Sequence, residues 1–170
     1  MAKMTETGKS KAKPKDNEEP GRKVVARNRR ARFDFDLLEK VEAGIVLTGT
    51  EVKSLRTGKA SLEEAYAGLD RGEVWLYGCD IPEYLQANRM NHKPKRPRKL
   101  LLHRSEIQKI ASKSTEKGLT LVPLQIYFKD GIAKVEICVA KGRKTFDKRE
   151  AIKKQDDRRE MDRVVRRRDY

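Results

Sequence analysis

Residues 119–140, "LTLVPLQIYFKDGIAKVEICVA", carry the clearest structural signal in this sequence. The two arms, 119–128 and 132–140, are rich in apolar residues, and the second alternates apolar with polar side chains as a half-buried strand does. Between them stands Asp130-Gly131, a dipeptide that favours a tight turn between antiparallel strands. The stretch therefore predicts a β-hairpin that completes a folded domain.

The chain before this hairpin supplies further short strands. "EEAYAGLDRGEVWLYGCDI" predicts a second hairpin, with arms at 64–69 and 73–79 around the turn Asp70-Arg71-Gly72. "RFDFDLL" alternates with period two and "AGIVLTG" is a short apolar run, so both favour strands. About six antiparallel strands at short spacing predict a mostly β fold, a small β-barrel.

Two or three helices are expected beside these strands. "TEVKSLRTGKA" predicts a short helix ended by Gly58, and "HRSEIQKIASKSTEKG" predicts a longer one ended by Gly118. Residues 82–99 contain three prolines and no apolar period, so they predict a long loop.

Charge divides the chain into three parts. Residues 1–32 hold 11 basic and 4 acidic side chains, residues 33–140 hold 17 and 15, and residues 141–170 hold 13 and 7, which gives a net charge of +15. We expect a disordered basic extension at 1–26, the barrel domain at 27–140 and a basic tail at 141–170. Basic arms on a nearly neutral body favour a polyanionic partner, most often nucleic acid.

The tail has the composition of a conditional helix. Residues 153–160 contain no apolar side chain, so the tail is expected to be disordered in the free protein. Beyond Gly142 it lacks Gly and Pro and is rich in helix-forming residues. A helix from Glu150 to Arg168 would extend roughly 28 Å, a length that suits an RNA-lined channel.

Several other classes of protein are disfavoured. No run of about 20 apolar residues and no signal-peptide core is present, so a cytoplasmic protein is expected. Cys79 and Cys138 fit no metal-binding spacing and are predicted to be buried, reduced thiols. Neither His92 nor His103 lies in a nucleophile motif, and no phosphate-binding glycine loop occurs, so an enzyme is not expected.

Four segments in fixed order carry a family resemblance: "NRRARFDF", "EAGIVLTGTEVKSLRTGKASLEEAY", "RKLLLHRSEI" and "AKGRKTFDKREAIKK". Over about residues 24–170 the chain resembles the SmpB family, with "GTEVKSLR" and the later "DKR" as the most specific strings. The resemblance implies an oligonucleotide-binding-type β-barrel that binds the tRNA-like domain of transfer-messenger RNA (tmRNA). It also implies delivery of that RNA to stalled bacterial ribosomes for trans-translation, in which the nascent chain is tagged and the ribosome is rescued.

The resemblance and the local chemistry together suggest a set of tmRNA-binding residues: Asn28, Arg30, Glu42, Lys53, Arg56, Arg98, Lys99, Leu101 and His103. Four of these, Lys53, Arg56, Arg98 and Lys99, are expected to neutralise phosphates. Leu101 is expected to pack in the core in preference to touching RNA directly. Glu42 either hydrogen-bonds a base edge or 2′-hydroxyl, or orients a neighbouring arginine. At the position of His103 some relatives have Asn.

The resemblance places the tail in the decoding centre and empty mRNA channel of the ribosome. The residues concerned are Lys141, Gly142, Arg143, Lys144, Phe146, Asp147, Lys148, Arg149, Lys153, Met161, Val164 and Val165. Phe146 offers a stacking face for an unpaired base where relatives often carry His or Tyr. Asp147 suits a helix N-terminus, and Met161, Val164 and Val165 share one helical face.

The partners implied are tmRNA, small-subunit ribosomal RNA and, through charged tmRNA, elongation factor Tu and alanyl-tRNA synthetase. No cofactor or metal is expected. A ribosomal or ribosome-assembly RNA-binding protein is the alternative, because it would also combine basic arms with a small β fold. An RNA-modifying enzyme that uses His92 or His103 is a third class.

Overall fold

The structure is a computed structural model, and it describes residues 21–87, 91–114 and 118–143 and the single positions 157 and 161. Within this part of the chain the elements are β1 (Arg22–Arg27), α1 (Ala31–Asp34), β2 (Phe35–Ile45), α2 (Gly49–Arg56), β3 (Tyr66–Asp70), β4 (Glu73–Tyr77), β5 (Arg98–Leu101), α3 (Arg104–Ser114), β6 (Leu119–Lys129) and β7 (Ile132–Gly142). All strand pairings are antiparallel. The predicted mostly β fold is confirmed.

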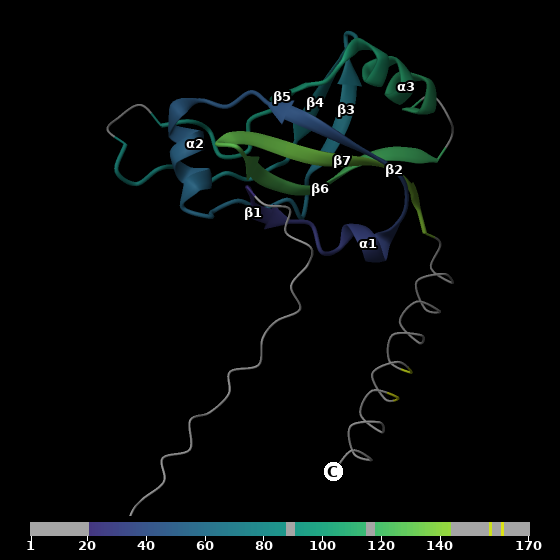
Figure 1. Ribbon diagram of the computed structural model, residues 1–170, viewed down its shortest axis with the longest axis horizontal. Coiled ribbons are helices and arrows are strands. Elements are labelled where there is room, and N and C mark those ends of the chain that lie inside the picture. The colour runs from purple at the N-terminus through teal and green to yellow at the C-terminus, as the bar shows by residue number, and fades with distance from the viewer. Residues whose placement is uncertain (1–20, 88–90, 115–117, 144–156, 158–160, 162–170) are drawn as a thin grey trace, which may run out of the picture.

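Six of the strands close into a barrel (Figure 1). The sheet order is β1-β6-β3-β4-β5-β2-β7, and an additional pairing of β6 with β7 closes the ring. β1 lies outside the ring as a second partner of β6. In the ring β4 stands three places from β7 in either direction, so these two strands lie on opposite sides of the barrel.

Both predicted hairpins are present. Asp130 and Gly131 link β6 to β7 with φ values of 51° and 80°, the pair of left-handed conformations that a tight hairpin turn requires. Arg71 and Gly72 repeat this geometry between β3 and β4, with φ values of 50° and 79°. In each hairpin a glycine occupies the second left-handed position at no steric cost.

Both predicted helices are present as well. At the start of α2 the Thr48 N–H donates to the Glu51 carboxylate at 2.7 Å, one half of a capping box, and just beyond the helix end Gly58 has φ 80°. At the start of α3 the His103 N–H donates to Glu106 at 2.8 Å. Ile110 is the buried residue of α3 and Ile107 packs partly buried against the same core, so the helix contacts the barrel through both side chains.

The structure differs from the expected boundaries at four places. β1 begins inside the segment 1–26, because its backbone pairs with β6 from Arg22↔Lys129 to Arg27↔Gln125. A four-residue helix, α1, stands where "RFDFDLL" predicts only strand. β5 adds a strand at the end of the expected loop, and β7 continues to Gly142, so the first two residues of the expected tail belong to the barrel.

Two apolar clusters hold the fold together. The larger fills the barrel interior and includes fully buried Leu55, Val74, Leu76, Ile126 and Val135. The smaller lies under α1, where Ala31, Val122 and Ala140 pack with Phe35, Leu37 and Leu124. Cys79 and Cys138 are free and buried as predicted, and burial raises the pKa of the Cys79 thiol to about 11. No helix among the described residues is long and apolar enough to cross a membrane.

Candidate nucleic-acid interface

The outer surface of β1, β6, β7 and β2 carries connected ion pairs, and we call it the polar face. At its centre Glu136 on β7 accepts from Arg22 at 3.0 Å and from Lys40 at 3.2 Å, and Gln125 donates to the same carboxylate. Burial acts to raise the pKa of Glu136, but the hydrogen bonds from Gln125 and Lys40 and the nearby charges outweigh it and lower the pKa. Glu136 therefore stays ionised and fixes two cations.

Glu42 on β2 organises the neighbouring part of the polar face. Lys134 forms an ion pair with it, and the Tyr127 hydroxyl donates to its other oxygen. The hydrogen bond from Lys134, followed by that from Tyr127, lowers the pKa of Glu42. Burial and the bond to Glu42 raise the pKa of Tyr127, so its hydroxyl remains a donor. The expected ion pair exists, but its partner is a lysine and not an arginine.

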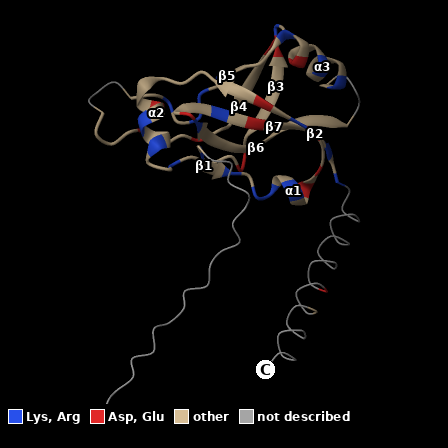
Figure 2. Cartoon of the chain, in the orientation of Figure 1, with Lys and Arg blue, Asp and Glu red and all other residues tan. Residues whose placement is uncertain are grey.

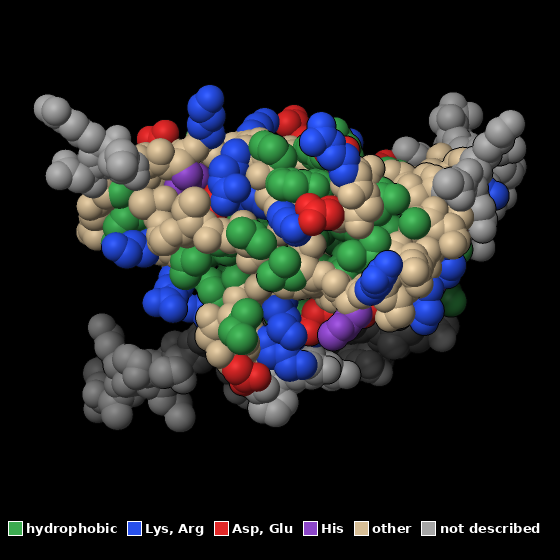
Figure 3. Space-filling model, turned by 90° about the horizontal axis from the view of Figure 1, so that it is seen from above, with side chains coloured by type: hydrophobic (Ala, Val, Ile, Leu, Met, Phe, Trp, Pro, Cys, Tyr) green, Lys and Arg blue, Asp and Glu red, His purple; other side chains and the backbone are tan. Residues whose placement is uncertain are grey.

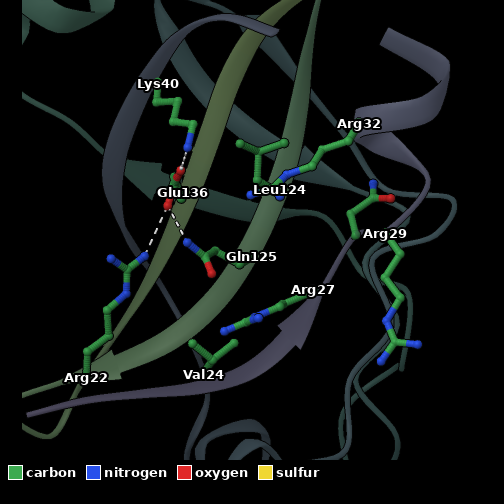
Figure 4. Close-up of a pocket in the computed structure, with 10 residues that line it drawn as sticks. Arg22, Val24, Arg27, Arg29, Arg32, Lys40, Leu124, Gln125 and Glu136 are labelled. Atoms are coloured by element: carbon green, nitrogen blue, oxygen red, sulfur yellow. Dashed lines mark hydrogen bonds and ion pairs between the residues drawn. The ribbon is translucent and has the colours of Figure 1, made fainter. Parts of the chain in front are cut away.

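A basic pocket of about 450 Å³ opens at the end of the polar face nearest α1. It is lined by Arg22, Val24, Arg27, Asn28, Arg29, Arg32, Lys40, Leu124, Gln125 and Glu136. Figure 4 shows Arg22, Lys40 and Gln125 converging on Glu136, with Arg27 and Arg32 reaching in from β1 and α1. Five cations thus share one pocket with a single carboxylate, which two of them already neutralise. The surplus positive charge suits the chemistry of an anion such as phosphate.

Asn28 is the residue that shapes this pocket. Its side-chain oxygen accepts from the Ala31 N–H at 3.0 Å, and its amide donates to the Leu62 carbonyl at 3.1 Å. With only 8% of its surface exposed, Asn28 lies where the chain passes from β1 into α1, and most of the arginines in 27–32 line the pocket. Figure 2 shows basic segments at this turn. Its position agrees with the expected RNA-contacting side, but its hydrogen bonds are made within the protein.

The basic residues of the pocket are the part of the site that the sequence-based expectation largely missed. Among the basic residues of the run 27–32 only Arg30 was expected to bind RNA, yet Arg30 is exposed and pairs with Asp34 at 3.7 Å. Arg29 and Arg32 have no ion pair or hydrogen bond within the described part of the chain. The density of arginine in "RNRRAR" was the available signal; the contribution of Arg22 and Lys40 depends on strand pairing.

Arg98 corrects the expectation for phosphate binding. Its side chain is fully buried, and its guanidinium donates to Glu51 at 2.9 Å and to the carbonyls of Cys79 and Pro94 at 2.6 and 2.8 Å. Arg96 donates to the same Glu51 carboxylate at 2.5 and 2.8 Å. The guanidinium of Arg98 donates all these hydrogen bonds to acceptors inside the protein. Arg98 therefore links the loop before β5 to Glu51 of α2 and is not available to a phosphate.

The other expected cations lie apart from the basic pocket. Lys53 and Arg56 are exposed on α2, which Figure 1 places at the other end of the barrel from α1. The Lys53 ammonium lies 5.8 Å from the Tyr84 ring centre. Lys99 is engaged with Glu73 on β4. Lys53, Arg56 and Lys99 can therefore contact a polyanion only on surfaces outside the basic pocket.

Leu101 corrects the expectation of core packing. It is 54% exposed on β5 and lies against Gly44 of β2, where a Cβ would stand 3.2 Å from the Leu101 Cβ. Glu42 is two residues from Gly44 on the same outer side of β2, so the strand pairing brings Glu42 and Leu101 together. His103 is exposed two residues farther on, just before α3. Figure 3 shows hydrophobic side chains gathered across one face, with basic side chains among them.

Most of the expected tail residues lie outside the described residues: Lys144, Phe146, Asp147, Lys148, Arg149, Lys153, Val164 and Val165. Lys141 and Gly142 end β7, and Arg143 donates to the Asp36 carboxylate at 2.7 Å. Met161 is described as a helical residue with 71% of its surface exposed.

A closed antiparallel β-barrel with a basic pocket on its outer surface is typical of small nucleic-acid-binding proteins, and this chain is of that class. The sequence model described as "SmpB protein" matches residues 25–167. The chain belongs to the SmpB family.

Curated relatives cover nearly the same length. The SsrA-binding protein of Salinispora arenicola is 59% identical over 150 residues, which span 88% of this chain and 94% of the relative. That of Azorhizobium caulinodans is 57% identical over 153 residues, 89% of this chain and 96% of the relative. A solved chain described by the words "tmRNA-SmpB: a journey to the center of the bacterial ribosome" is 47% identical, with a TM-score of 0.62, and covers 74% of this chain and 92% of that chain.

Proposed function

We propose that this protein is the tmRNA-binding adaptor of trans-translation: its barrel binds the tRNA-like domain of tmRNA and delivers it to stalled ribosomes. The basic pocket is the observation that carries this proposal, because it gathers five cations around one neutralised carboxylate on a family member. Phosphate contacts supply most of the affinity in such complexes, and they orient the protein on its RNA.

The polar face suggests a division of labour within the barrel. Arg29 and Arg32 meet backbone phosphates, since no partner within the described residues engages them. Glu42 accepts from Lys134 and from the buried Tyr127 hydroxyl, so Lys134 is held in a fixed direction and faces the RNA as an ordered donor. Leu101 and His103 extend the same surface with an apolar side chain and a ring that can hydrogen-bond or stack.

The tail completes the proposal on the ribosome. Residues from Lys144 onward are proposed to enter the decoding centre and the empty mRNA channel, where ribosomal RNA neutralises their charge and allows a helix. Elongation factor Tu and alanyl-tRNA synthetase join as partners through the charged tmRNA, and the site of action is the cytoplasm. The support is family membership together with the basic composition of this segment.

Binding to the isolated tRNA-like domain tests the proposal. Affinity is measured against an unrelated structured RNA of equal length over a series of salt concentrations, for the natural chain and for Arg29→Ala combined with Arg32→Ala. The double variant should lower the slope of log K against log salt by about 1.5, since each lost phosphate contact contributes roughly 0.7–0.9.

Arg71→Ala, which removes an exposed cation from the β3–β4 turn, is the matched control and should leave the slope unchanged. Equal affinity for the two RNAs at moderate salt would contradict specific tmRNA recognition. Equal slopes for the double variant and the control would remove the basic pocket from the interface.

A further inference from the structure

The outer side of β3 and β4 carries an aromatic surface that RNA binding at the polar face leaves unused. Strand register places Tyr66 opposite Tyr77 and Gly68 opposite Trp75. The two tyrosine rings stack with their centres 5.3 Å apart and their planes at 22°. A Cβ on Gly68 would stand 3.4 Å from the Tyr77 ring, so the missing side chain lets that ring lie across β3. We call Tyr66, Trp75 and Tyr77 the aromatic face.

This surface is not part of the core. Tyr66 is 54% exposed, whereas its strand neighbour Ala67 points inward and is 5% exposed. Val74 and Leu76, which alternate with Trp75 along β4, are also fully buried. The side chains on the interior side of β3 and β4 therefore pack in the core. The aromatic side chains on the outer side do not contribute to that core. Tyr66 is exposed and Trp75 and Tyr77 are half-buried, and aromatic side chains that stay partly accessible on a surface are common at binding sites.

The aromatic face has an acidic surround, in contrast to the rest of the chain. Residues 61–83 contain six carboxylates and one cation, Arg71. The carboxylates are Glu63, Glu64, Asp70, Glu73, Asp80 and Glu83. Register places Asp70 and Glu73 opposite each other at the hairpin end beyond Trp75, and Lys99, which is paired with Trp75 across β4 and β5, forms an ion pair with Glu73. Lys95 pairs with Glu64, so the segment keeps more carboxylates than cations. Because β4 stands opposite β7 in the ring, the polar and aromatic faces look in opposite directions.

We propose that the aromatic face docks an Arg- and Lys-rich segment of a protein partner. Guanidinium and ammonium groups are attracted to the faces of Trp and Tyr rings, and carboxylates beside the rings give them charged hydrogen-bond acceptors. The same carboxylates repel phosphate, which disfavours nucleic acid as the occupant. Since the two faces are opposite, the barrel holds RNA on one side and a basic polypeptide on the other at the same time.

Trp75 is the one tryptophan of the chain, so its fluorescence reports on this surface. The probe is a 12-residue peptide of alternating Arg and Ala, titrated into the full-length protein bound to the tRNA-like RNA. The control peptide replaces each Arg with citrulline, which keeps the shape and removes the charge. A saturable change in Trp75 emission with the Arg peptide, and none with the citrulline peptide, is the expected result.

Two variants separate the aromatic face from general electrostatics. Asp70→Lys reverses a charge beside the aromatic face and should weaken peptide binding at least tenfold, while Asp157→Lys makes the same change in net charge at an exposed position of the tail. Tyr66→Ala should weaken binding with the charges unchanged.

Three results would overturn the proposal. One is no saturable change up to about 1 mM peptide, a limit that corresponds to roughly 4 kcal/mol of binding. Another is equal weakening by Asp70→Lys and Asp157→Lys. The third is tighter quenching of Trp75 by a ten-nucleotide oligouridine than by the Arg peptide, which would assign the aromatic face to RNA.

Discussion

The pair Glu51–Arg98 is the most constrained interaction in the described structure. Both side chains are fully buried, and Arg98 also satisfies the carbonyls of Cys79 and Pro94. A buried ion pair with its remaining donors satisfied contributes little net stability, but removal of one partner leaves an uncompensated charge. The pair therefore fixes the geometry of the loop before β5 more than it stabilises the fold.

Arg98→Met should destabilise the protein by about 3–5 kcal/mol, because Glu51 would keep a buried charge with only Arg96 to neutralise it. Urea unfolding followed by circular dichroism measures the change. Lys53→Met, an exposed substitution on the same helix as Glu51, is the control and should stay within about 0.5 kcal/mol. A similar small loss for Arg98→Met would show that water reaches the pair.

Acid should unfold the protein through the same carboxylate. Burial acts to raise the pKa of Glu51, but the hydrogen bonds from Arg96 and Thr48 and the charges of Arg98 and Arg96 lower it below its usual value of 4.5. A group with a depressed folded-state pKa contributes its full stability above the unfolded pKa and loses it as pH falls through the folded pKa.

The free energy of unfolding should therefore be steady from pH 7 to about 5 and fall below about pH 4.5. Urea titrations at a series of pH values measure this dependence. Glu51→Gln removes the titrating group, so its curve should fall less steeply at low pH. An identical slope in the variant would assign acid lability to other carboxylates, of which Glu136 is the next candidate because its pKa is also lowered.

The four-residue helix α1 contributes both to the packing of the barrel and to the basic pocket. It covers the small apolar cluster on the outside of the barrel and supplies Arg32 to the basic pocket. Its conformation depends on Asn28, whose two side-chain hydrogen bonds join β1, α1 and the segment before β3. A change at Asn28 thus alters stability and the basic pocket together.

Asn28→Ala should cost about 1–2 kcal/mol, since it leaves the Ala31 N–H without its side-chain acceptor and the Leu62 carbonyl without its side-chain donor. It should also weaken RNA binding several-fold, because Arg29 and Arg32 lose their fixed spacing. Thermal unfolding and RNA affinity measure the two effects. Arg30→Ala is the neighbouring control for stability, with an expected change within about 0.5 kcal/mol. Weaker RNA binding with unchanged stability would make Asn28 a direct RNA contact.

The elements that could be predicted from sequence were those with a local signal. Both hairpins have their turn glycine at a position where φ is positive, and Gly58 marks the end of α2, so short stretches were enough. β1 and β5 have no adjacent turn that pairs them with a neighbour in sequence, so they become strands only through distant partners. For the same reason Arg98 looked like a phosphate ligand: nothing near it in sequence reveals Glu51, 47 residues away.

In the whole molecule the surfaces to which we assign functions lie apart from one another. The polar face and basic pocket lie around β7, the aromatic face lies around β4, and the basic tail begins where β7 ends. Arg143 still contacts the barrel through Asp36, so contacts of the barrel reach at least to residue 143, beyond the expected boundary at 141.

Truncation after Arg143 should preserve tmRNA binding within about threefold and abolish tagging on stalled ribosomes. The barrel keeps all of β7 and the Arg143–Asp36 pair, so its stability should be unchanged. Affinity for the tRNA-like domain and tagging in a reconstituted translation reaction are the two measurements. Truncation after Ala140 is the informative companion, because it shortens β7 and should lower the melting temperature as well. Loss of tmRNA binding in the longer truncation would contradict the separation of barrel from tail.

Closure of the barrel by its last strand has a kinetic consequence. β7 joins β2 to β6, and the pairing Phe35↔Gly142 spans most of the described chain. Until β7 has been synthesised, β2 and β6 each lack a neighbour, and an unpaired strand edge is a template for association with other chains. Long-range pairing of this kind also slows folding, since the loop must be closed before the contacts form. The nascent protein is therefore most vulnerable to aggregation just before its final strand emerges, a period in which chaperone protection would matter most.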